Sequence, residues 1–548
     1  MFRSYLTTAI RNLSKRKGYT FLNVLGLAIG MACCTVIALF VVDELSYDRY
    51  HRNSGEIYRL IDGQSAETAP ALMWALKKDY PEVREYVRLR PPAGVWMMRY
   101  GDKVFFEHRV FWTDASLFRV FSFVLAQGSP ETALVAPKTV VITQTVARRY
   151  FGSEDPMGKT IVADDGFADL TVTGVMEDIP ANTHFQGDFF VSMSTQEAVW
   201  QDGRVGSWSD SQYHSYVLLE PGVSVSDLVA KLPDFIEKYV PAVKRTWRGP
   251  FDLDLQAVTD IHLYSDLEDE LGPNGDMDYL FTMGGIGLFA LLVACINFVN
   301  LSTARAVDRG REVGMRKVLG ANWSQLGSQF LGESVMLAFL AMILSFLISG
   351  ISLTWFGSLT GKVLSFDVLF SPYGLVCVLG SALLVGVLSG TYPAIVLASM
   401  RPVSVLSGGN TGTGNSLLRR GLVIVQFGVS VLLLIGTGIT FRQLNFLQER
   451  HLGFDKENVI TSPMGTVSGL EEGVQIFTDR IRNHPGVVSM SRSMSMPGRS
   501  GGQGILGSSP TTVKKLDMVP VDLERLWVDF DYLETLGLEL IAGRDFVY

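Results

Sequence analysis

Five long apolar stretches constrain this chain more than any other feature of its sequence. They lie at residues 21–42, 280–301, 335–356, 373–397 and 422–441. Each has the ~20 mostly apolar residues that a helix needs in order to cross about 30 Å of hydrocarbon. Only 19% of the residues are charged, whereas soluble globular proteins carry roughly 25%. The sequence therefore predicts a multi-pass α-helical membrane protein with five transmembrane helices.

Basic residues indicate which ends of these spans face the cytoplasm, because short flanking segments rich in Lys and Arg stay on that side. Such segments are the arm at 1–20, the segment at 302–334 and the linker at 398–421. We therefore expect a cytoplasmic N-terminus and a first span that is a retained signal anchor. Residues 43–279 and 442–548 would then lie outside.

The region 43–279 is too long to be a loop and predicts a folded domain. Residues 71–80 are typical of a helix, whereas 139–143 and 170–175 are rich in β-formers. Turn signals separate these pieces. A mixed α/β domain is expected.

No motif predicts catalysis or cofactor binding. Gly152–Thr160 resembles a phosphate-binding loop but has one residue too many between its glycines, and Gly502–Gly507 matches a dinucleotide pattern without a strand before it. The acidic run 266–270 lacks the alternating spacing of a calcium loop, so a solvated face is the preferred interpretation. The net charge of −8 gives no support for nucleic-acid binding. We expect no enzyme activity, no metal and no cofactor in this chain.

Polar and small residues within the spans are expected to join helices. Asn297, Asn300 and Gln426 lie in hydrocarbon and should hydrogen-bond to neighbouring helices. Gly26 and Gly30 form a small-xxx-small pair, which is a weak dimerisation signal.

An internal repeat is expected outside the membrane. Trp112, Asp114 and Gly128 match Trp527, Asp529 and Gly543 without a gap, and Tyr80-Pro81 answers to His484-Pro485. Shared order of basic arm, span and these motifs favours duplication over chance. If so, 442–548 is part of a second domain, and the chain is expected to be C-terminally truncated.

The most specific motif follows the second span. Residues 304–321 read Ala-Arg-Ala-Val-Asp-Arg-Gly-Arg-Glu-Val-Gly-Met-Arg-Lys-Val-Leu-Gly-Ala, here named the signature segment. It resembles the signature of FtsX-like permeases in the MacB-type ABC transporter superfamily. Residues 43–51 resemble the start of the external domain in the long, duplicated members of that family, and 140–175 resembles the MacB-type periplasmic core domain.

The resemblance implies a MacB-type periplasmic core domain at 43–279, part of a second one at 442–548, and a location in the bacterial inner membrane. It implies a permease subunit that couples ATP hydrolysis by a separate cytoplasmic ABC ATPase dimer to movement of the periplasmic domain. The outcome would be export, efflux or extraction of a substrate by mechanotransmission. ATP and magnesium belong to the partner ATPase. Membrane lipids, and a periplasmic adaptor or outer-membrane component, are further partners.

Within 302–334 the resemblance implies a short coupling helix that lies along the membrane and docks into a cleft on the ATPase. We assign this coupling to Arg309, Arg311, Glu312, Val313, Gly314, Arg316, Lys317, Gly320 and Ala321. The basic side chains are expected near the lipid, and the small residues are expected to permit close backbone approach. A merely basic anchor is the alternative, but charge alone does not explain Glu-Val-Gly or Leu-Gly-Ala.

Two other functions remain alternatives. One is a transmembrane signalling or regulatory subunit that drives a periplasmic hydrolase without transport. The other is a membrane-anchored periplasmic enzyme, which the lack of a catalytic cluster disfavours. The sequence leaves the substrate open among lipoproteins, peptides, macrolides and lipids.

Overall fold

The structure is a computed structural model of the chain. It describes residues 17–91, 94–163, 168–200, 204–208, 210–239, 251–304, 313–399, 416–450, 453–455, 457–461, 471–493 and 527–546. The fold divides into two units. One joins Met1–Leu45 to Met277–Arg450, and the other joins Ser46–Asp276 to His451–Tyr548.

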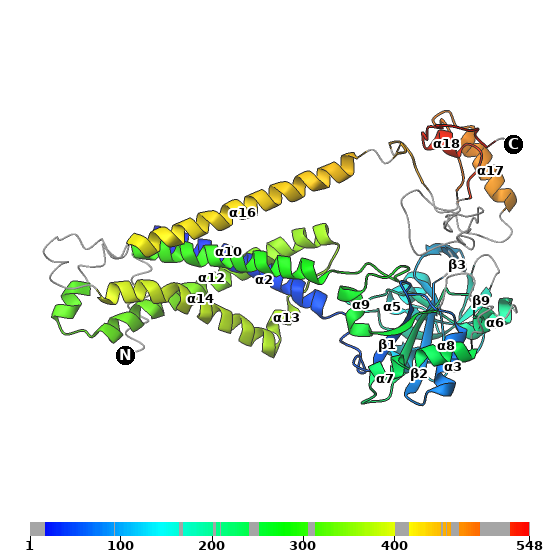
Figure 1. Cartoon of the computed structure of the whole chain (residues 1–548), viewed down its shortest axis with the longest axis horizontal. Coiled ribbons are helices and arrows are strands. Elements are labelled where there is room, and N and C mark those ends of the chain that lie inside the picture. The colour runs from blue at the N-terminus through cyan, green and yellow to red at the C-terminus, as the bar shows by residue number, and fades with distance from the viewer. Residues whose placement is uncertain are drawn as a thin grey trace. The chain divides into compact units, whose positions relative to one another are not determined.

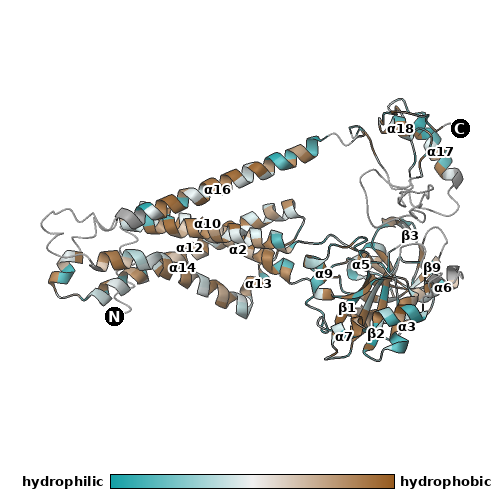
Figure 2. Cartoon of the chain, viewed as in Figure 1, coloured by the Kyte–Doolittle hydropathy of each residue, from teal (hydrophilic) through white to brown (hydrophobic). Residues whose placement is uncertain are grey.

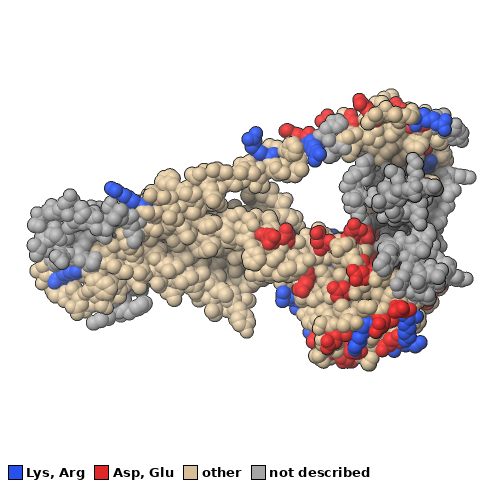
Figure 3. All heavy atoms as spheres, viewed as in Figure 1, with Lys and Arg blue, Asp and Glu red and all other residues tan. Residues whose placement is uncertain are grey.

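Five helices of the described chain are long and apolar enough to cross a membrane, and they make up the first unit. They are α2 (Lys17–Leu45), α10 (Met277–Ala304), α12 (Trp323–Thr360), α14 (Pro372–Ser399) and α16 (Ser416–Glu449), with the short α13 (Asp367–Phe370) between α12 and α14 (Figure 1). Hydrophobic residues run along all five helices in Figure 2, and charged residues are sparse on the face of them that Figure 3 shows. The predicted multi-pass membrane fold is confirmed.

The helices extend beyond the apolar stretches that predicted them. α12 begins at Trp323, well before the stretch at 335–356. A capping box sets this start, because the side chains of Asn322 and Gln325 each accept the other residue's backbone N–H. Hydropathy marks only the apolar part of a helix, whereas the helix continues to its capping residues.

α2, α10 and α12 pack around a shared apolar core. Leu27 and Met31 of α2 contact Phe298 of α10 and Leu337 and Ala341 of α12 within this cluster. Gly30 allows the closest approach: a Cβ built there would lie 2.4 Å from the Cβ of Ala294 in α10. The small-xxx-small pair in α2 therefore serves packing within the chain, as small residues do between membrane helices.

Two of the three polar residues singled out in the spans pair between helices as predicted. Nδ2 of Asn300 in α10 donates to Oε1 of Gln426 in α16 at 3.4 Å. The bond gives one donor and one acceptor a partner where no water is available.

We expect Gly30→Leu to destabilise the membrane unit by about 1–3 kcal/mol, since added atoms in a closely packed contact force the helices apart. Thermal unfolding of the full chain in detergent measures the change. Gly284→Leu in α10 is the matched control, because a Cβ at Gly284 meets nothing within 4 Å. Equal melting temperatures for the two variants would contradict the proposed contact.

The second unit contains a mixed α/β domain at Ser46–Asp276. Its strands are β1 (Ile57–Asp62), β2 (Val83–Arg90), β3 (Trp96–Tyr100), β4 (Lys103–Glu107), β5 (Val110–Thr113), β6 (Leu125–Gln127), β7 (Thr139–Thr143), β8 (Thr160–Ala163), β9 (Ala168–Met176), β10 (Phe189–Ser192), β11 (His214–Leu219) and β12 (Leu253–Ala257). Its helices are α3 (Ala71–Asp79), α4 (Leu117–Val120), α5 (Gln144–Phe151), α6 (Met193–Trp200), α7 (Val225–Val229), α8 (Leu232–Tyr239) and α9 (Val258–Tyr264), with one 3₁₀ turn, η2 (Arg204–Gly206). The predicted helix at 71–80 and strands at 139–143 and 170–175 are confirmed.

All twelve strands join one sheet in the order β12-β1-β11-β2-β5-β10-β7-β9-β8-β3-β4, with β6 paired to β9. Strands β5, β7 and β10 in the middle of the sheet are buried along their whole length, because both faces of the sheet are covered there. Phe189 and Val191 of β10 point into one core cluster, and Phe190 between them points into the other. This alternation follows from the two-residue period of a strand.

Ion pairs with buried arginines lie in the interior of this domain. Nη2 of Arg88 in β2 lies 2.7 Å from Oδ1 of Asp114. Arg59 in β1 is fully buried and donates to both carboxylate oxygens of Glu270. Glu270 ends the acidic run that the sequence suggested was a solvated face, so that interpretation is wrong for this residue. Its carboxylate is turned inward because a buried guanidinium needs a compensating charge.

Acid should destabilise the α/β domain through two buried histidines. Burial lowers the pKa of His51 to about 4 and that of His214 to about 4, whereas histidine in an unfolded chain titrates near 6.5. The unfolded chain therefore binds more protons between these values. We expect the full stabilisation above about pH 6.5 and its progressive loss toward pH 4, on the order of a few kcal/mol in total.

Tryptophan-fluorescence melts of the full chain between pH 7.5 and 5 measure this slope. The double variant His51→Gln with His214→Gln should flatten it. His108→Gln, which replaces an exposed histidine, is the control and should keep it. A slope that survives the double variant would place the titration elsewhere.

The described C-terminal residues share several local features with this domain. α17 (Glu471–Arg482) and α18 (Tyr532–Thr535) correspond to α3 and α4. Nε of Arg492 lies 3.3 Å from Oδ2 of Asp529, which repeats the pair of Arg88 and Asp114. The backbone contacts match as well. Ser493 follows Arg492 and forms a β-bridge with Val528, which precedes Asp529. In the same way, Leu89 follows Arg88 and pairs with Thr113, which precedes Asp114. Gly128 and Gly543 both have positive φ, +97° and +105°.

Candidate functional site

Of the signature segment, the structure describes Ala304, at the end of α10, and residues 313–321. Arg309, Arg311 and Glu312 lie outside the described residues. Residues 313–318 form a short helix that precedes α12. Val313 and Gly314 are buried. Val313 packs with Leu326 of α12 and Leu397 of α14, so this short helix lies against the ends of two spanning helices.

Two predicted coupling cations bond to the chain's own helices. Nη1 of Arg316 donates to Oε1 of Gln329 in α12 at 2.9 Å. Nζ of Lys317 donates to the backbone oxygen of Ala398 at 2.7 Å. Ala398 is in the last turn of α14, where free carbonyl groups and the helix dipole favour a cation. These residues hold the short helix between α12 and α14.

Gly320 and Ala321 form the turn that joins the short helix to α12. The N–H of Ala321 donates to the oxygen of Arg316, and that of Gly320 to the oxygen of Lys317, each at 3.0 Å. This is the Schellman arrangement, in which a left-handed residue ends a helix. Gly320 has a φ of +95°, and a Cβ there would meet nothing within 4 Å. The absence of a side chain therefore permits this backbone conformation.

The opposite face of the short helix is apolar and exposed. Met315 is 60% exposed, Val318 68% and Leu319 86%. Residues three and four apart lie on the same side of a helix, so 315, 318 and 319 form one face and 313, 316 and 317 the other. The sequence assignment missed the exposed residues, although their spacing could have revealed them. The sequence assignment favoured charged residues because Lys and Arg mark the cytoplasmic side of membrane spans.

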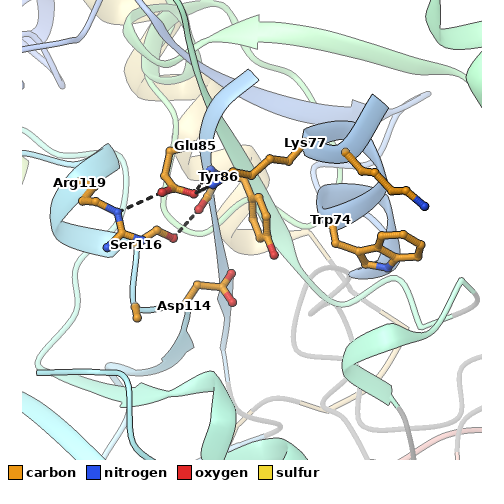
Figure 4. A pocket seen from close by; sticks show the side chains of 9 residues that line it. Trp74, Lys77, Glu85, Tyr86, Asp114, Ser116 and Arg119 are labelled. Carbon is orange, nitrogen blue, oxygen red and sulfur yellow. Dashed lines mark hydrogen bonds and ion pairs between the residues drawn. The ribbon is translucent and has the colours of Figure 1, made fainter. Parts of the chain in front are cut away.

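The α/β domain has a groove that is lined by charged and aromatic side chains (Figure 4). It has a volume of about 440 Å³. The carboxylates that line it are compensated within the domain: Glu85 pairs with Lys77 and Arg119, and Asp114 pairs with Arg88. Figure 4 shows the carboxylate of Glu85 beside the guanidinium of Arg119. A groove with paired charges gives no physical basis for assigning a ligand.

The described residues give no support for a nucleotide site or a metal site. The segment Gly152–Thr160 ends in strand β8, whereas a phosphate-binding loop must lead into a helix. Gly502–Gly507 lies outside the described residues. In the described part of the chain, no three His, Cys, Asp or Glu side chains are grouped so that they could hold a metal ion.

A membrane-helix unit and an α/β domain inserted after the first span define a multi-pass membrane protein with a large inserted domain. Two family models match the chain: the MacB-like periplasmic core domain at residues 20–235 and the FtsX-like permease C-terminal domain at residues 284–402. Over these two regions the chain is similar to FtsX-like, MacB-type ABC transporter permeases, the family that the signature segment resembles.

Curated relatives include macrolide export ATP-binding/permease proteins MacB. That of Bdellovibrio bacteriovorus is 25% identical over 268 residues, 48% of this chain and 38% of the relative. MacB 1 of Yersinia pestis is 24% identical over 425 residues, 74% of this chain and 61% of the relative. The chain thus spans 38% to 61% of the length of these relatives. Among solved structures, the periplasmic region of MacB from Actinobacillus actinomycetemcomitans matches at 14% identity and a TM-score of 0.28, over 38% of this chain and 90% of that one.

We expect Gly320→Ala to strain the turn before α12, because a side chain in this left-handed conformation costs roughly 1–2 kcal/mol. Amides of residues 319–326 should exchange with solvent about tenfold faster. Hydrogen exchange on the full chain measures this. Gly327→Ala, in the helical part of α12 with nothing within 4 Å of its Cβ, should exchange no faster than wild type. Unchanged exchange in Gly320→Ala would contradict the role of the turn.

Proposed function

We propose that this chain is the permease subunit of an ABC transporter and that a separate cytoplasmic ATPase acts on its signature segment. The carrying observation is the two-faced short helix at 313–318. Val313, Arg316 and Lys317 seat it on α12 and α14, and Met315 and Leu319 face away. A helix fixed on one side and apolar on the other is suited to bind a partner protein.

The exposed residues supply the contact, and the cations supply its support. Arg316 and Lys317 are bonded to α12 and α14, so a force on Leu319 passes to those helices rather than bending the segment. The contact residues proposed here are Met315, Val318 and Leu319. The ordered turn at Gly320 places them directly before α12.

α12 carries the displacement across the membrane. Its 38 residues extend about 57 Å at 1.5 Å per residue. Lys362 follows its end, and its Nζ lies 2.5 Å from Oε1 of Glu44 and 3.1 Å from Oδ2 of Asp43 at the end of α2. Ser349 of α12 donates to the oxygen of Ala32 in α2 at 3.4 Å. α2 leads into the α/β domain, which becomes the moving part on the periplasmic side.

ATP hydrolysis is assigned to the partner in this proposal. The matched family regions are permease and periplasmic domains, and the loop at Gly152–Thr160 continues as a strand. The relatives' names include ATP binding, and our proposal places ATP binding on a second polypeptide. Movement of the periplasmic domain would export or extract a substrate.

We expect Leu319→Asp to abolish recovery of an ABC ATPase with the full chain purified in mild detergent. A buried carboxylate at the centre of an apolar contact is strongly unfavourable. Mass spectrometry of the copurified proteins measures this. Val488→Asp is the matched control, since Val488 is 98% exposed and lies in the repeat unit, and it should recover the ATPase as wild type does.

Undiminished ATPase recovery with Leu319→Asp would overturn the assigned contact. ATP hydrolysis by the purified chain alone would overturn the separation of permease and ATPase. Recovery of an adaptor or outer-membrane component with the ATPase would favour export over the signalling alternative.

A further inference from the structure

We propose that Asp48 and Arg59 are positioning residues that fix the two connections between the α/β domain and its flanking spans, so that the domain follows α2 and α10 when they move. The proposal rests on the function proposed above and names where the movement enters the domain. α2 ends at Leu45 and α10 begins at Met277. Both connections are short, so whatever holds them decides whether a movement is transmitted or absorbed.

Asp48 holds the first connection from a buried, left-handed position. Its side chain is fully buried and its φ is +58°, a conformation that is strained for a residue other than glycine. The carboxylate accepts the backbone N–H of His184 at 3.3 Å and lies 2.9 Å from Nδ1 of the same residue. Nε2 of His51 lies 3.8 Å from it. Strain that persists in this way is imposed by the surroundings and is typical of functional positions.

The loop at 180–184 also holds the backbone on either side of Asp48. The N–H of Asp48 donates to the oxygen of Asn182 at 2.9 Å. Nδ2 of Asn182 donates to Oγ of Ser46 at 2.9 Å and to its backbone oxygen at 3.3 Å. The first residues after α2 are thereby tied to a loop of the domain through both backbone and side chains.

Hydrogen bonds continue from Asp48 into the centre of the sheet. Nε2 of His184 lies 2.8 Å from the hydroxyl of Tyr216 in β11. Tyr216 is fully buried and pairs across the sheet with Arg59 in β1. The two charged groups of the proposal are therefore linked through His184 and Tyr216.

Arg59 holds the second connection. Its Nη1 donates to Oε2 of Glu270 at 2.5 Å and its Nη2 to Oε1 at 2.8 Å. Nη2 also donates to Oε1 of Gln256 at 2.6 Å and to Oγ of Ser265 at 3.0 Å. Ser265 and Glu270 lie in the segment that leads to α10 at Met277. A bidentate guanidinium fixes that segment in orientation as well as position.

The two connections also touch each other. The ring of Tyr47, next to Asp48, stacks on that of His262 in α9 with centroids 3.4 Å apart. The oxygen of His262 accepts the N–H of Gly275 at 2.7 Å, just before α10. A Cβ on Gly272 would lie 2.7 Å from the oxygen of His184. The entrance and exit of the domain thus share residues, and a movement of either span reaches both clusters.

Hydrogen exchange on the full chain in lipid nanodiscs, with its copurifying ATPase, tests the proposal. In Asp48→Asn without nucleotide, amides of 46–51 and 181–184 should exchange at least tenfold faster, while those of β7 and β10 keep their protection. With ATP and vanadate, wild type should show altered exchange in the α/β domain, and Asp48→Asn should lose that response. Asp114→Asn is the matched control: it removes the carboxylate from another interior ion pair of the same domain and should keep the ATP response.

Each outcome decides one claim. Wild-type protection of 46–51 and 181–184 in Asp48→Asn overturns the anchoring role. Loss of protection with an intact ATP response overturns transmission through Asp48, as does loss of the response in Asp114→Asn to the same extent. No ATP response in wild type defeats the proposed function, while the nucleotide-free exchange still decides the anchoring.

A milder variant keeps the test decisive if Asp48→Asn fails to fold. Tyr47→Leu removes the stack on His262 and leaves both charged clusters in place. It should raise exchange in 46–51 and near Gly275 and weaken the ATP response. Wild-type behaviour in both measurements would overturn the proposal.

Discussion

The bilayer allows no unpaired backbone group, and this constraint shapes the whole membrane unit. In hydrocarbon each peptide N–H and C=O must find its partner within the chain, so spanning segments are continuous helices. α12 satisfies this over 38 residues, from a capping box at Asn322 to a left-handed glycine at Gly361. A continuous helix is stiff along its axis. The same requirement that lets the segment exist in lipid therefore makes it suited to carry displacement between the two sides.

The signature segment works with the ends of such helices. The last carbonyl groups of α14 lack partners within the helix, and Lys317 supplies one for Ala398. Arg316 bonds to Gln329 on α12. Positive charges that orientation rules explain as a topology signal thus also fasten the short helix. The apolar side chains of Met315, Val318 and Leu319 are left as the exposed surface of the short helix.

The sequence predicted the elements better than their contacts. Unbroken apolar runs identified the spans, and the β-formers of Thr139–Thr143 identified a central strand, because both signals are local. Trp112 and Asp114 indicated a repeat because they recur at the same spacing later in the chain. Glu270 was misinterpreted because its partner, Arg59, lies 211 residues away. Asp48 gave no signal of burial or of a left-handed backbone. Such features depend on which distant residues the fold brings together, and a local pattern does not encode them.

The repeat shows which part of a connection is local. Tyr47 and Asp48 follow α2, and Phe454 and Asp455 follow α16, so an aromatic residue and an aspartate come after each of these two helices. Their partners differ. The N–H of Asp48 donates to Asn182, whereas that of Asp455 donates to the oxygen of Leu536 at 2.7 Å. The chain places an aspartate shortly after each of these two helices, and the residues folded around it determine which groups it contacts.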